Sequence, residues 1–76
     1  MSAHYKSPSE YLLADIDDQI LTITLNRPEQ LNSLRPEMLD GIRTLISQTE
    51  SDKEIAVVVI EGAGRAFSAG VDLKVL

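Results

Sequence analysis

The sequence predicts an α/β fold with the element order ββαβ, on the basis of three hydrophobic patterns. Leu21, Ile23 and Leu25 alternate with threonines, which is typical of a half-buried strand. Apolar residues recur at helical spacing across residues 36–49, which predicts an amphipathic helix. Residues 55–60 form the unbroken apolar run IAVVVI, which indicates a strand buried on both faces of a parallel sheet.

The first two strands are expected over residues 11–17 and 20–25. The link between them, Asp17-Asp18-Gln19, is short and polar, so it favours an antiparallel hairpin. It lacks the Asn-Gly or Asp-Gly pair that marks a type I′ turn, so the sequence leaves the turn type open.

The helix is expected to run from Pro36 to Thr49. Proline suits the first helical position because its missing N–H has no partner to lose there. Arg35 falls at the N-cap, where it cannot accept a backbone hydrogen bond as Ser or Asp would. A strand, this helix and the strand at residues 55–60 form a β-α-β crossover. In such folds ligands bind at the carboxyl ends of parallel strands, which is the position of residues 62–73.

The length of the chain limits its domain organisation. With 76 residues it forms at most one small domain with a thin core. We assign residues 1–10 to a flexible leader and residues 11–76 to the folded segment. His4 lies in the leader, where a loose terminal residue is expected rather than a metal ligand. The chain has no cysteine, which excludes disulfides and thiolate metal sites.

The charge and hydropathy of the chain narrow its partners and its location. A net charge of −5 argues against nucleic acid as the main partner. The longest apolar run is far too short to span a bilayer, and the N-terminal residues lack the apolar stretch of a secretory signal. We therefore expect no membrane partner and a cytoplasmic location, with which the absence of cysteine agrees.

The stretch GAGRAFSAGVDLK near the end of the chain allows three interpretations. A dinucleotide site would use Gly62 and Gly64, but its third glycine would have to stand where the chain has Phe67. A tight turn after a buried strand would need the first two glycines only for positive φ angles. In a backbone-donor site, the small residues Ala69 and Gly70 would let a ligand carbonyl approach the N–H of the next residue.

Two segments together resemble a known family. LNRPEQLNSL and, about thirty residues later, GAGRAFSAGVDLK closely resemble the N-terminal part of the crotonase, or enoyl-CoA hydratase/isomerase, superfamily. The resemblance covers residues 11–76. It implies the N-terminal ββαβ part of a crotonase (ClpP/crotonase-like) spiral β-β-α fold, which would be incomplete in this chain.

The resemblance also implies roles for individual residues. In relatives, the residue after the last glycine of the loop gives the first oxyanion-hole N–H, which polarises an acyl-CoA thioester carbonyl. Here that residue is Val71, where relatives more often have Ala or Gly, so the space beside the donor would be narrower. Gln30 replaces a small residue and is a second departure. The positions that the resemblance implies for binding the substrate are Gln30, Leu31, Ala69, Gly70, Asp72, Leu73 and Lys74.

By this resemblance the chain would be part of an acyl-CoA enzyme of hydratase/isomerase type. Coenzyme A would enter as part of the substrate, with no prosthetic group, and the full-length form would be a homotrimer or hexamer. The catalytic glutamates of relatives come from later segments. Glu50, Glu54 and Glu61 do not match them and are expected on the solvated surface. The alternative is a truncated, non-catalytic fragment that acts only by packing or association.

Overall fold

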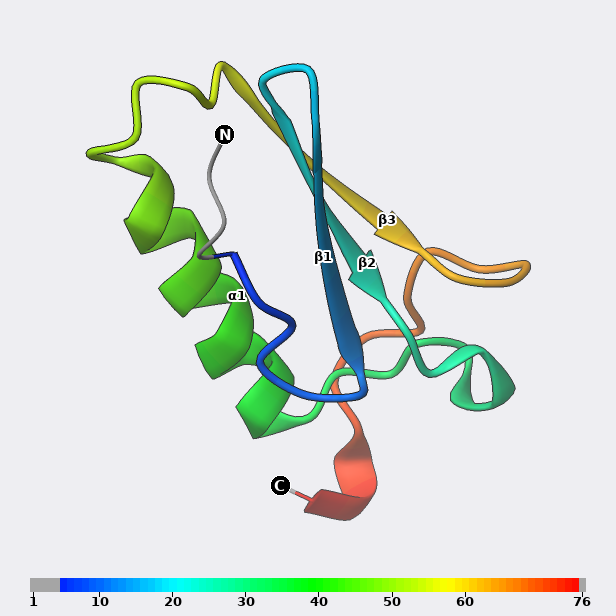
Figure 1. The fold of residues 1–76 in the computed structure, drawn as a ribbon. Helices are drawn as coiled ribbons and strands as arrows, with labels where there is room; N and C mark the ends of the chain where they lie inside the picture. Colours follow the sequence, from blue (N-terminus) through cyan, green and yellow to red (C-terminus); the bar gives the residue numbers. More distant parts are fainter. Residues whose placement is uncertain (1–4, 76) are drawn as a thin grey trace.

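A single α-helix packs against one face of a three-stranded sheet in the computed structural model, which describes residues 5–75 (Figure 1). In chain order the elements are β1 (Leu12–Asp17), β2 (Ile20–Leu25), the 3-10 helix η1 (Pro28–Gln30), α1 (Pro36–Thr49), β3 (Val57–Gly62) and the 3-10 helix η2 (Leu73–Val75). β2 lies in the centre, antiparallel to β1 and parallel to β3. The ββαβ order, the antiparallel hairpin and the parallel crossover are therefore confirmed.

The hairpin between β1 and β2 closes with a two-residue turn. Asp18 and Gln19 have φ angles of 50° and 69°, and positive φ at both central residues is the mark of a type I′ turn. The carbonyl of Gln19 accepts hydrogen bonds from the N–H groups of Ala56, at 2.8 Å, and Val57, at 3.3 Å. The turn thus also fixes where β3 begins, although neither of its residues is the glycine that this geometry favours.

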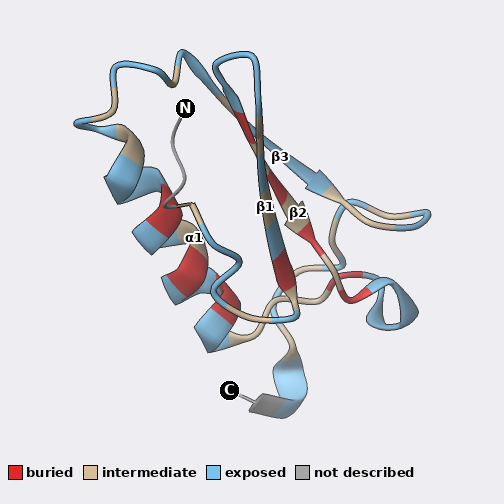
Figure 2. Cartoon of the chain, in the orientation of Figure 1, coloured by how far each residue is buried: buried red, intermediate tan, exposed pale blue. Residues whose placement is uncertain are grey.

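The hydrophobic core lies between α1 and the facing side of β1 and β2 (Figure 2). Alternation along β2 and helical spacing along α1 bring together six buried apolar side chains: Leu12, Leu21, Ile23, Leu25, Met38 and Leu45. The helix begins at Pro36, as the sequence predicts, and Arg35 at its N-cap makes no side-chain capping hydrogen bond. The core is thin because one helix covers one face of the sheet.

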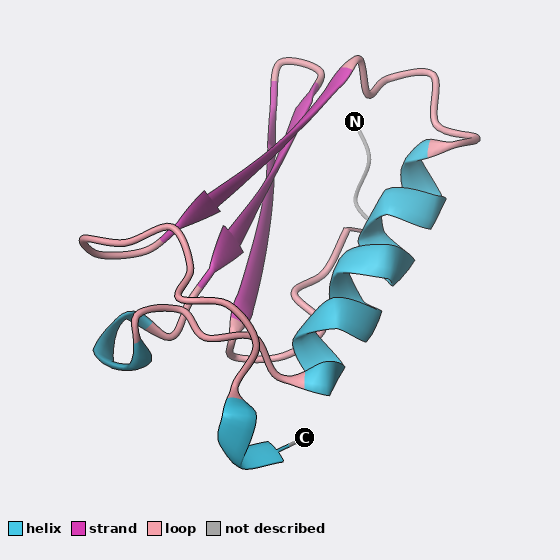
Figure 3. Ribbon diagram, turned by 180° about the vertical axis from the view of Figure 1, so that it is seen from behind, coloured by secondary structure: helices cyan, strands magenta, loops and turns pink. Residues whose placement is uncertain are grey.

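The prediction that the last strand is buried on both faces is wrong for this chain. β3 begins at Val57, and the side chains of Val57, Val59 and Ile60 are 50%, 38% and 37% exposed. The reason is that α1 lies on one side of the sheet only (Figure 3). The opposite face, which carries Val57 and Val59, is covered by no element that the structure describes. Ile60 pairs with the core residue Ile23 and so lies on the α1 side, where it is partly exposed because β3 is at the edge of the sheet.

The segment before β1 was predicted to be a flexible leader over residues 1–10. In the structure its described part, residues 5–10, contacts the fold: the hydroxyl of Tyr5 donates to Asp52 Oδ2 at 3.0 Å, and the side chain of Tyr5 packs against the core. Ser7 Oγ accepts a hydrogen bond from the N–H of Ala14. His4 lies outside the described residues.

Replacing Gln19 by glycine should raise the free energy of unfolding by about 0.5–1 kcal/mol, because glycine adopts a positive φ without steric strain. The change also creates the Asp-Gly pair that type I′ turns favour. Gln48→Gly, on the exposed side of α1, is the matched control and should lower stability by about 1 kcal/mol. Urea unfolding followed by circular dichroism measures both. A loss of stability in Gln19→Gly would contradict the strain assigned to the turn.

Candidate functional site

The two sequence segments that carry the family resemblance lie side by side at the carboxyl ends of β2 and β3. The N–H of Ala63, just after β3, donates to the carbonyl of Leu25 at 2.8 Å. Further along, the N–H of Ala69 donates to the carbonyl of Leu31 at 2.9 Å. The glycine-rich loop therefore packs along the connection between β2 and α1, at the edge of the sheet where α/β folds bind ligands.

Asn32 joins these two segments through its side-chain amide. It is fully buried, and its Nδ2 donates to the carbonyls of Ala63 and Ala66 at 2.9 and 2.8 Å. Its Oδ1 accepts from the N–H of Arg27 at 2.8 Å, and its own carbonyl accepts from Ser68 Oγ at 2.8 Å. The side chain of Asn32 therefore provides partners for main-chain groups of both segments.

Sequence reasoning missed Asn32, although two signals pointed to it. Asn is one of the few residues that adopt the left-handed conformation readily, and Asn32 has a φ of 55°. Its side-chain amide also carries both donors and an acceptor, which suits a position where backbone carbonyls and a backbone N–H both need partners.

Arg27 is the second buried polar residue of the connection, at 8% exposure. Its Nη1 donates to the carbonyl and Oγ of Ser33, at 2.9 and 3.1 Å, and to Asp72 Oδ2 at 3.3 Å. Its Cζ lies 5.2 Å from the centroid of the Tyr11 ring, a cation–π distance. Through these contacts Arg27 shapes the connection, and its guanidinium is occupied inside the fold.

Asp72, predicted to line the substrate groove, uses its carboxylate inside the fold. Oδ2 pairs with Arg27, and Oδ1 accepts the N–H of Lys74 at 3.0 Å, where η2 begins. The backbone hydrogen bond from Lys74 is the largest cause that lowers the pKa of Asp72, and the hydrogen bond and charge of Arg27 act in the same direction. Partial burial opposes them, and the pKa remains below its ordinary value.

The glycines of the loop have different reasons to be glycine. Gly62 has no positive φ, so that expectation is wrong for it; instead, a Cβ there would lie 2.4 Å from the carbonyl oxygen of Ala66 and 2.5 Å from that of Phe67. Gly64 and Gly70 have φ angles of 78° and 99°, which favour glycine. On the side where a Cβ of Gly70 would stand, nothing lies within 4 Å.

Val71 follows Gly70 and forms an isolated parallel bridge with Leu34. The N–H of Leu34 donates to the carbonyl of Gly70 at 2.7 Å, and the N–H of Asp72 donates to the carbonyl of Leu34 at 2.9 Å. The carbonyl of Gly70 and the N–H of Val71 belong to one planar trans peptide and point in opposite directions. The Val71 N–H is therefore directed away from Leu34, and within residues 5–75 it donates no hydrogen bond.

The other predicted substrate-binding residues lie around Val71, mostly with exposed side chains. The hydrogen bond between Ala69 and Leu31 brings those two together, and Gln30 precedes Leu31 at the end of η1. Leu73 is 81% exposed and lies with Lys74 in η2, which begins two residues after Val71. The structure thus gathers these residues at one edge of the sheet, next to a main-chain donor.

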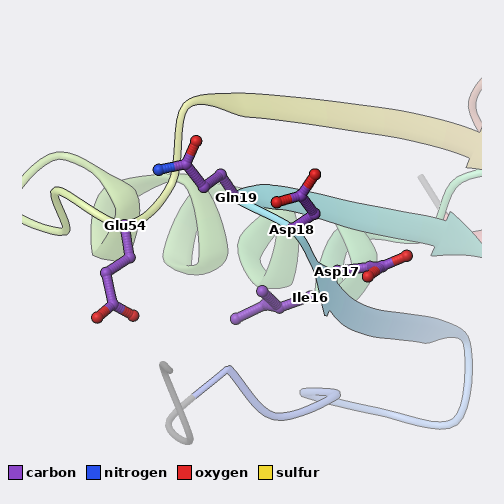
Figure 4. A pocket seen from close by; sticks show the side chains of 5 residues that line it. All are labelled: Ile16, Asp17, Asp18, Gln19 and Glu54. Atoms are coloured by element: carbon purple, nitrogen blue, oxygen red, sulfur yellow. The ribbon is translucent and has the colours of Figure 1, made fainter.

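A cavity of about 410 Å³ lies elsewhere, at the hairpin end of the sheet (Figure 4). It is lined by Ile16, Asp17, Asp18, Gln19 and Glu54. This is the end where β3 begins, whereas the glycine-rich loop follows the end where β3 stops, so the cavity is not part of the candidate site. Glu50, Glu54 and Glu61 are exposed, as expected.

The described part of the chain contains neither a metal-binding cluster nor a membrane-spanning helix. In residues 5–75 no group of three or more His, Cys, Asp or Glu side chains is arranged to hold a metal ion. No helix of that part of the chain has the length and hydropathy needed to cross a bilayer.

A family model, related proteins and solved structures all identify the same family. The family model for enoyl-CoA hydratase/isomerase matches residues 20–76. A 1,2-epoxyphenylacetyl-CoA isomerase of Escherichia coli (strain K12) is 42% identical over 65 residues, which cover 86% of this chain and 25% of that protein. A probable enoyl-CoA hydratase, EchA14, of Mycobacterium tuberculosis (strain H37Rv) is 38% identical over the same shares of each chain.

Solved structures match the fold. A crystal structure of an enoyl-CoA hydratase from Mycobacterium tuberculosis H37Rv superposes with a TM-score of 0.80 at 41% identity, covering 84% of this chain and 29% of that one. An enoyl-CoA hydratase from Mycobacterium avium gives a TM-score of 0.82 at 39% identity, covering 88% and 30%.

The fold is accordingly the N-terminal ββαβ part of the crotonase fold. The chain belongs to the enoyl-CoA hydratase/isomerase family, and it spans about a quarter of the length of the curated relatives that it matches.

Replacing Asn32 by alanine should lower the free energy of unfolding by on the order of 3 kcal/mol, because it leaves one buried N–H and two carbonyls unpaired. Asn26→Ala is the matched control: it removes one exposed hydrogen bond to the carbonyl of Glu10 and should cost less than about 1 kcal/mol. Urea unfolding compares the two variants. Equal losses would show that Asn32 does not hold the segments together.

The lowered pKa of Asp72 makes part of the stability dependent on pH. A carboxyl group whose folded pKa lies below its unfolded value, about 3.9, contributes stability that is fully present above that value. The contribution falls as pH drops through the folded pKa. The stability difference between the natural chain and Asp72→Asn should thus be constant from pH 7 to about 5 and shrink below about 4. Denaturant unfolding across this range tests it; a difference that grows on acidification contradicts it.

Proposed function

We propose that this chain supplies the first oxyanion-hole donor and part of the coenzyme A groove of an acyl-CoA enzyme of hydratase/isomerase type. The observation that supports this most directly is the N–H of Val71. It is unpaired within the described residues and held facing away from the bridge with Leu34. Membership of the enoyl-CoA hydratase/isomerase family supports the same function, as does the similarity to a 1,2-epoxyphenylacetyl-CoA isomerase.

The chemistry follows from a fixed main-chain dipole. The α-carbon of a thioester becomes acidic when negative charge on the enolate oxygen is stabilised, and an N–H that is already oriented stabilises it without reorganisation. Hydrogen bonds of Gly70 and Asp72 to Leu34 fix the backbone on both sides of Val71. The donor is main chain, so a valine can supply it as well as a smaller residue. The valine side chain, 48% exposed, would narrow the space for the acyl group.

The groove for coenzyme A would be formed by exposed residues on either side of this donor. Leu31 and Ala69 would contact the pantetheine and adenine parts, with Gln30 extending the wall where relatives have a small residue. Leu73 would add apolar surface, and the ammonium group of Lys74 would approach the phosphates. Coenzyme A enters here as part of the substrate. Each of these side chains is accessible, which binding requires.

Proton transfer would need groups from a longer chain. Glu50 and Glu54 stand between α1 and β3, and Glu61 accepts a hydrogen bond from Thr24 Oγ1 at 3.2 Å within the sheet. We therefore assign thioester binding and oxyanion stabilisation to this segment and acid–base catalysis to segments that only longer family members carry. We also propose that such a full-length form is a cytoplasmic homotrimer or hexamer.

The second candidate is a non-catalytic fragment that acts by packing or association. The exposed apolar side chains of β3, Val57, Val59 and Ile60, favour it, because solvent-facing apolar strands commonly mark contact surfaces. Calorimetry of the purified chain with butyryl-CoA separates the two candidates. Binding of the thioester supports the first, whereas a fragment that acts by packing alone should not bind it.

Nuclear magnetic resonance can test the donor directly. Titrating the chain with butyryl-CoA should move the Val71 amide proton downfield, because its N–H gains a carbonyl acceptor, whereas free CoA should not. The hydrogen bond should make butyryl-CoA bind roughly three- to tenfold more tightly than CoA. The Leu34 amide, already bonded to Gly70, is the internal control.

Calorimetry with CoA and with NAD completes this test. Binding of NAD without CoA would indicate a nucleotide-binding β-α-β module instead. Equal responses of Val71 to butyryl-CoA and to CoA would rule out the thioester oxygen as its partner.

A further inference from the structure

Resting on the proposed function, we infer that Arg27 and Asp72 are positioning residues, whose ion pair sets the direction in which the Val71 N–H points. Neither residue would touch the thioester. Both would act through the bridge between Leu34 and Val71, which orients the peptide that carries the donor.

The first step of the argument is that this peptide has little restraint of its own. Gly70 has a φ of 99°, and nothing lies within 4 Å of the place where its Cβ would stand. Glycine also rotates more freely than any other residue. The direction of the Val71 N–H therefore depends on the hydrogen bond that holds the other end of the same peptide, from the N–H of Leu34 to the carbonyl of Gly70.

The second step is that Arg27 contacts both segments that form the bridge between Leu34 and Val71. Its Nη1 binds the carbonyl of Ser33, the residue before Leu34, and the carboxylate of Asp72, the residue after Val71. A guanidinium that contacts the neighbours of both bridge partners keeps the two segments at hydrogen-bonding distance. The carboxylate of Asp72 also restrains the backbone after Val71, since its Oδ1 accepts the N–H of Lys74.

The third step is that the pair is shielded from water. The side chains of Arg27 and Asp72 are only 10% and 12% exposed. The pair of Arg35 and Glu37, a few residues away in the chain, is 33% and 50% exposed. Exposed pairs contribute little to structure because solvent screens them, whereas removal of one partner from a buried pair leaves an unpaired charge. The two pairs therefore form a natural comparison.

Asp72→Asn removes the charge of the carboxylate with almost no change in shape and keeps an oxygen for the N–H of Lys74. Glu37→Gln does the same in the exposed pair and is the matched control. Residual dipolar couplings of the ligand-free chain report the direction of each N–H bond. We expect the Val71 coupling to change in Asp72→Asn, while those of β2 keep their values. Glu37→Gln should leave all of them unchanged.

The second readout is the affinity ratio of butyryl-CoA to CoA. In Asp72→Asn this ratio should fall at least threefold toward one, with the affinity for CoA itself changed less than twofold. Arg27→Lys, which keeps the positive charge but loses the planar fork, should give the same pattern more weakly. It replaces Asp72→Asn if that variant does not fold.

Several results would overturn the inference. Unchanged Val71 couplings in both variants would show that the pair does not orient the donor. Couplings that change throughout β2 and β3 would show a general structural role instead. If the natural chain binds butyryl-CoA and CoA equally, the proposed function fails; the couplings, which need no ligand, then still decide whether the ion pair directs the N–H.

Discussion

The buried side-chain amide of Asn32 is the constraint on which the rest of this edge of the molecule depends. The connection after β2 and the loop after β3 both leave regular structure, so their backbone groups lose their sheet partners. Asn32 supplies partners for the N–H of Arg27 and for the carbonyls of Ala63 and Ala66 without contact with solvent. Because unpaired buried backbone is costly, the two segments can pack together only in the arrangement that this amide satisfies.

Once the loop is held in this way, the side chains of Ser68 and Asp72 are used inside the fold. Ser68 Oγ donates to the carbonyl of Asn32 and accepts the N–H of Gly70, and Asp72 is shared between Arg27 and Lys74. Among residues 5–75, no buried side-chain nitrogen or oxygen lacks a partner. Val71 lies between two residues whose backbone is bonded to Leu34, while within residues 5–75 its own main-chain N–H donates no hydrogen bond.

The sequence predicted those parts of the structure that depend on local pattern. The helix has the predicted bounds, Pro36–Thr49, because proline and the apolar period are read from neighbouring residues. The predicted burial of β3 was wrong because it depends on which elements cover each face of an edge strand, and no local pattern records that. The turn at Asp18 and Gln19 was left open because a non-glycine residue occupies a glycine conformation. Asn32 was missed because a single polar residue in a connection has no period.

The site divides its residues into those fixed by geometry and those free to vary. Gly62 is fixed because backbone oxygens fill the space of its Cβ, and Gly70 because its φ is positive. Val71 is under neither constraint: its side chain is half exposed, and the group it offers is main chain. A change of residue there would alter the space beside the donor without removing the donor. On the proposed function, the main-chain N–H of Val71 would stabilise charge and its side chain would select the acyl group. The two roles can therefore change independently, although one residue provides both.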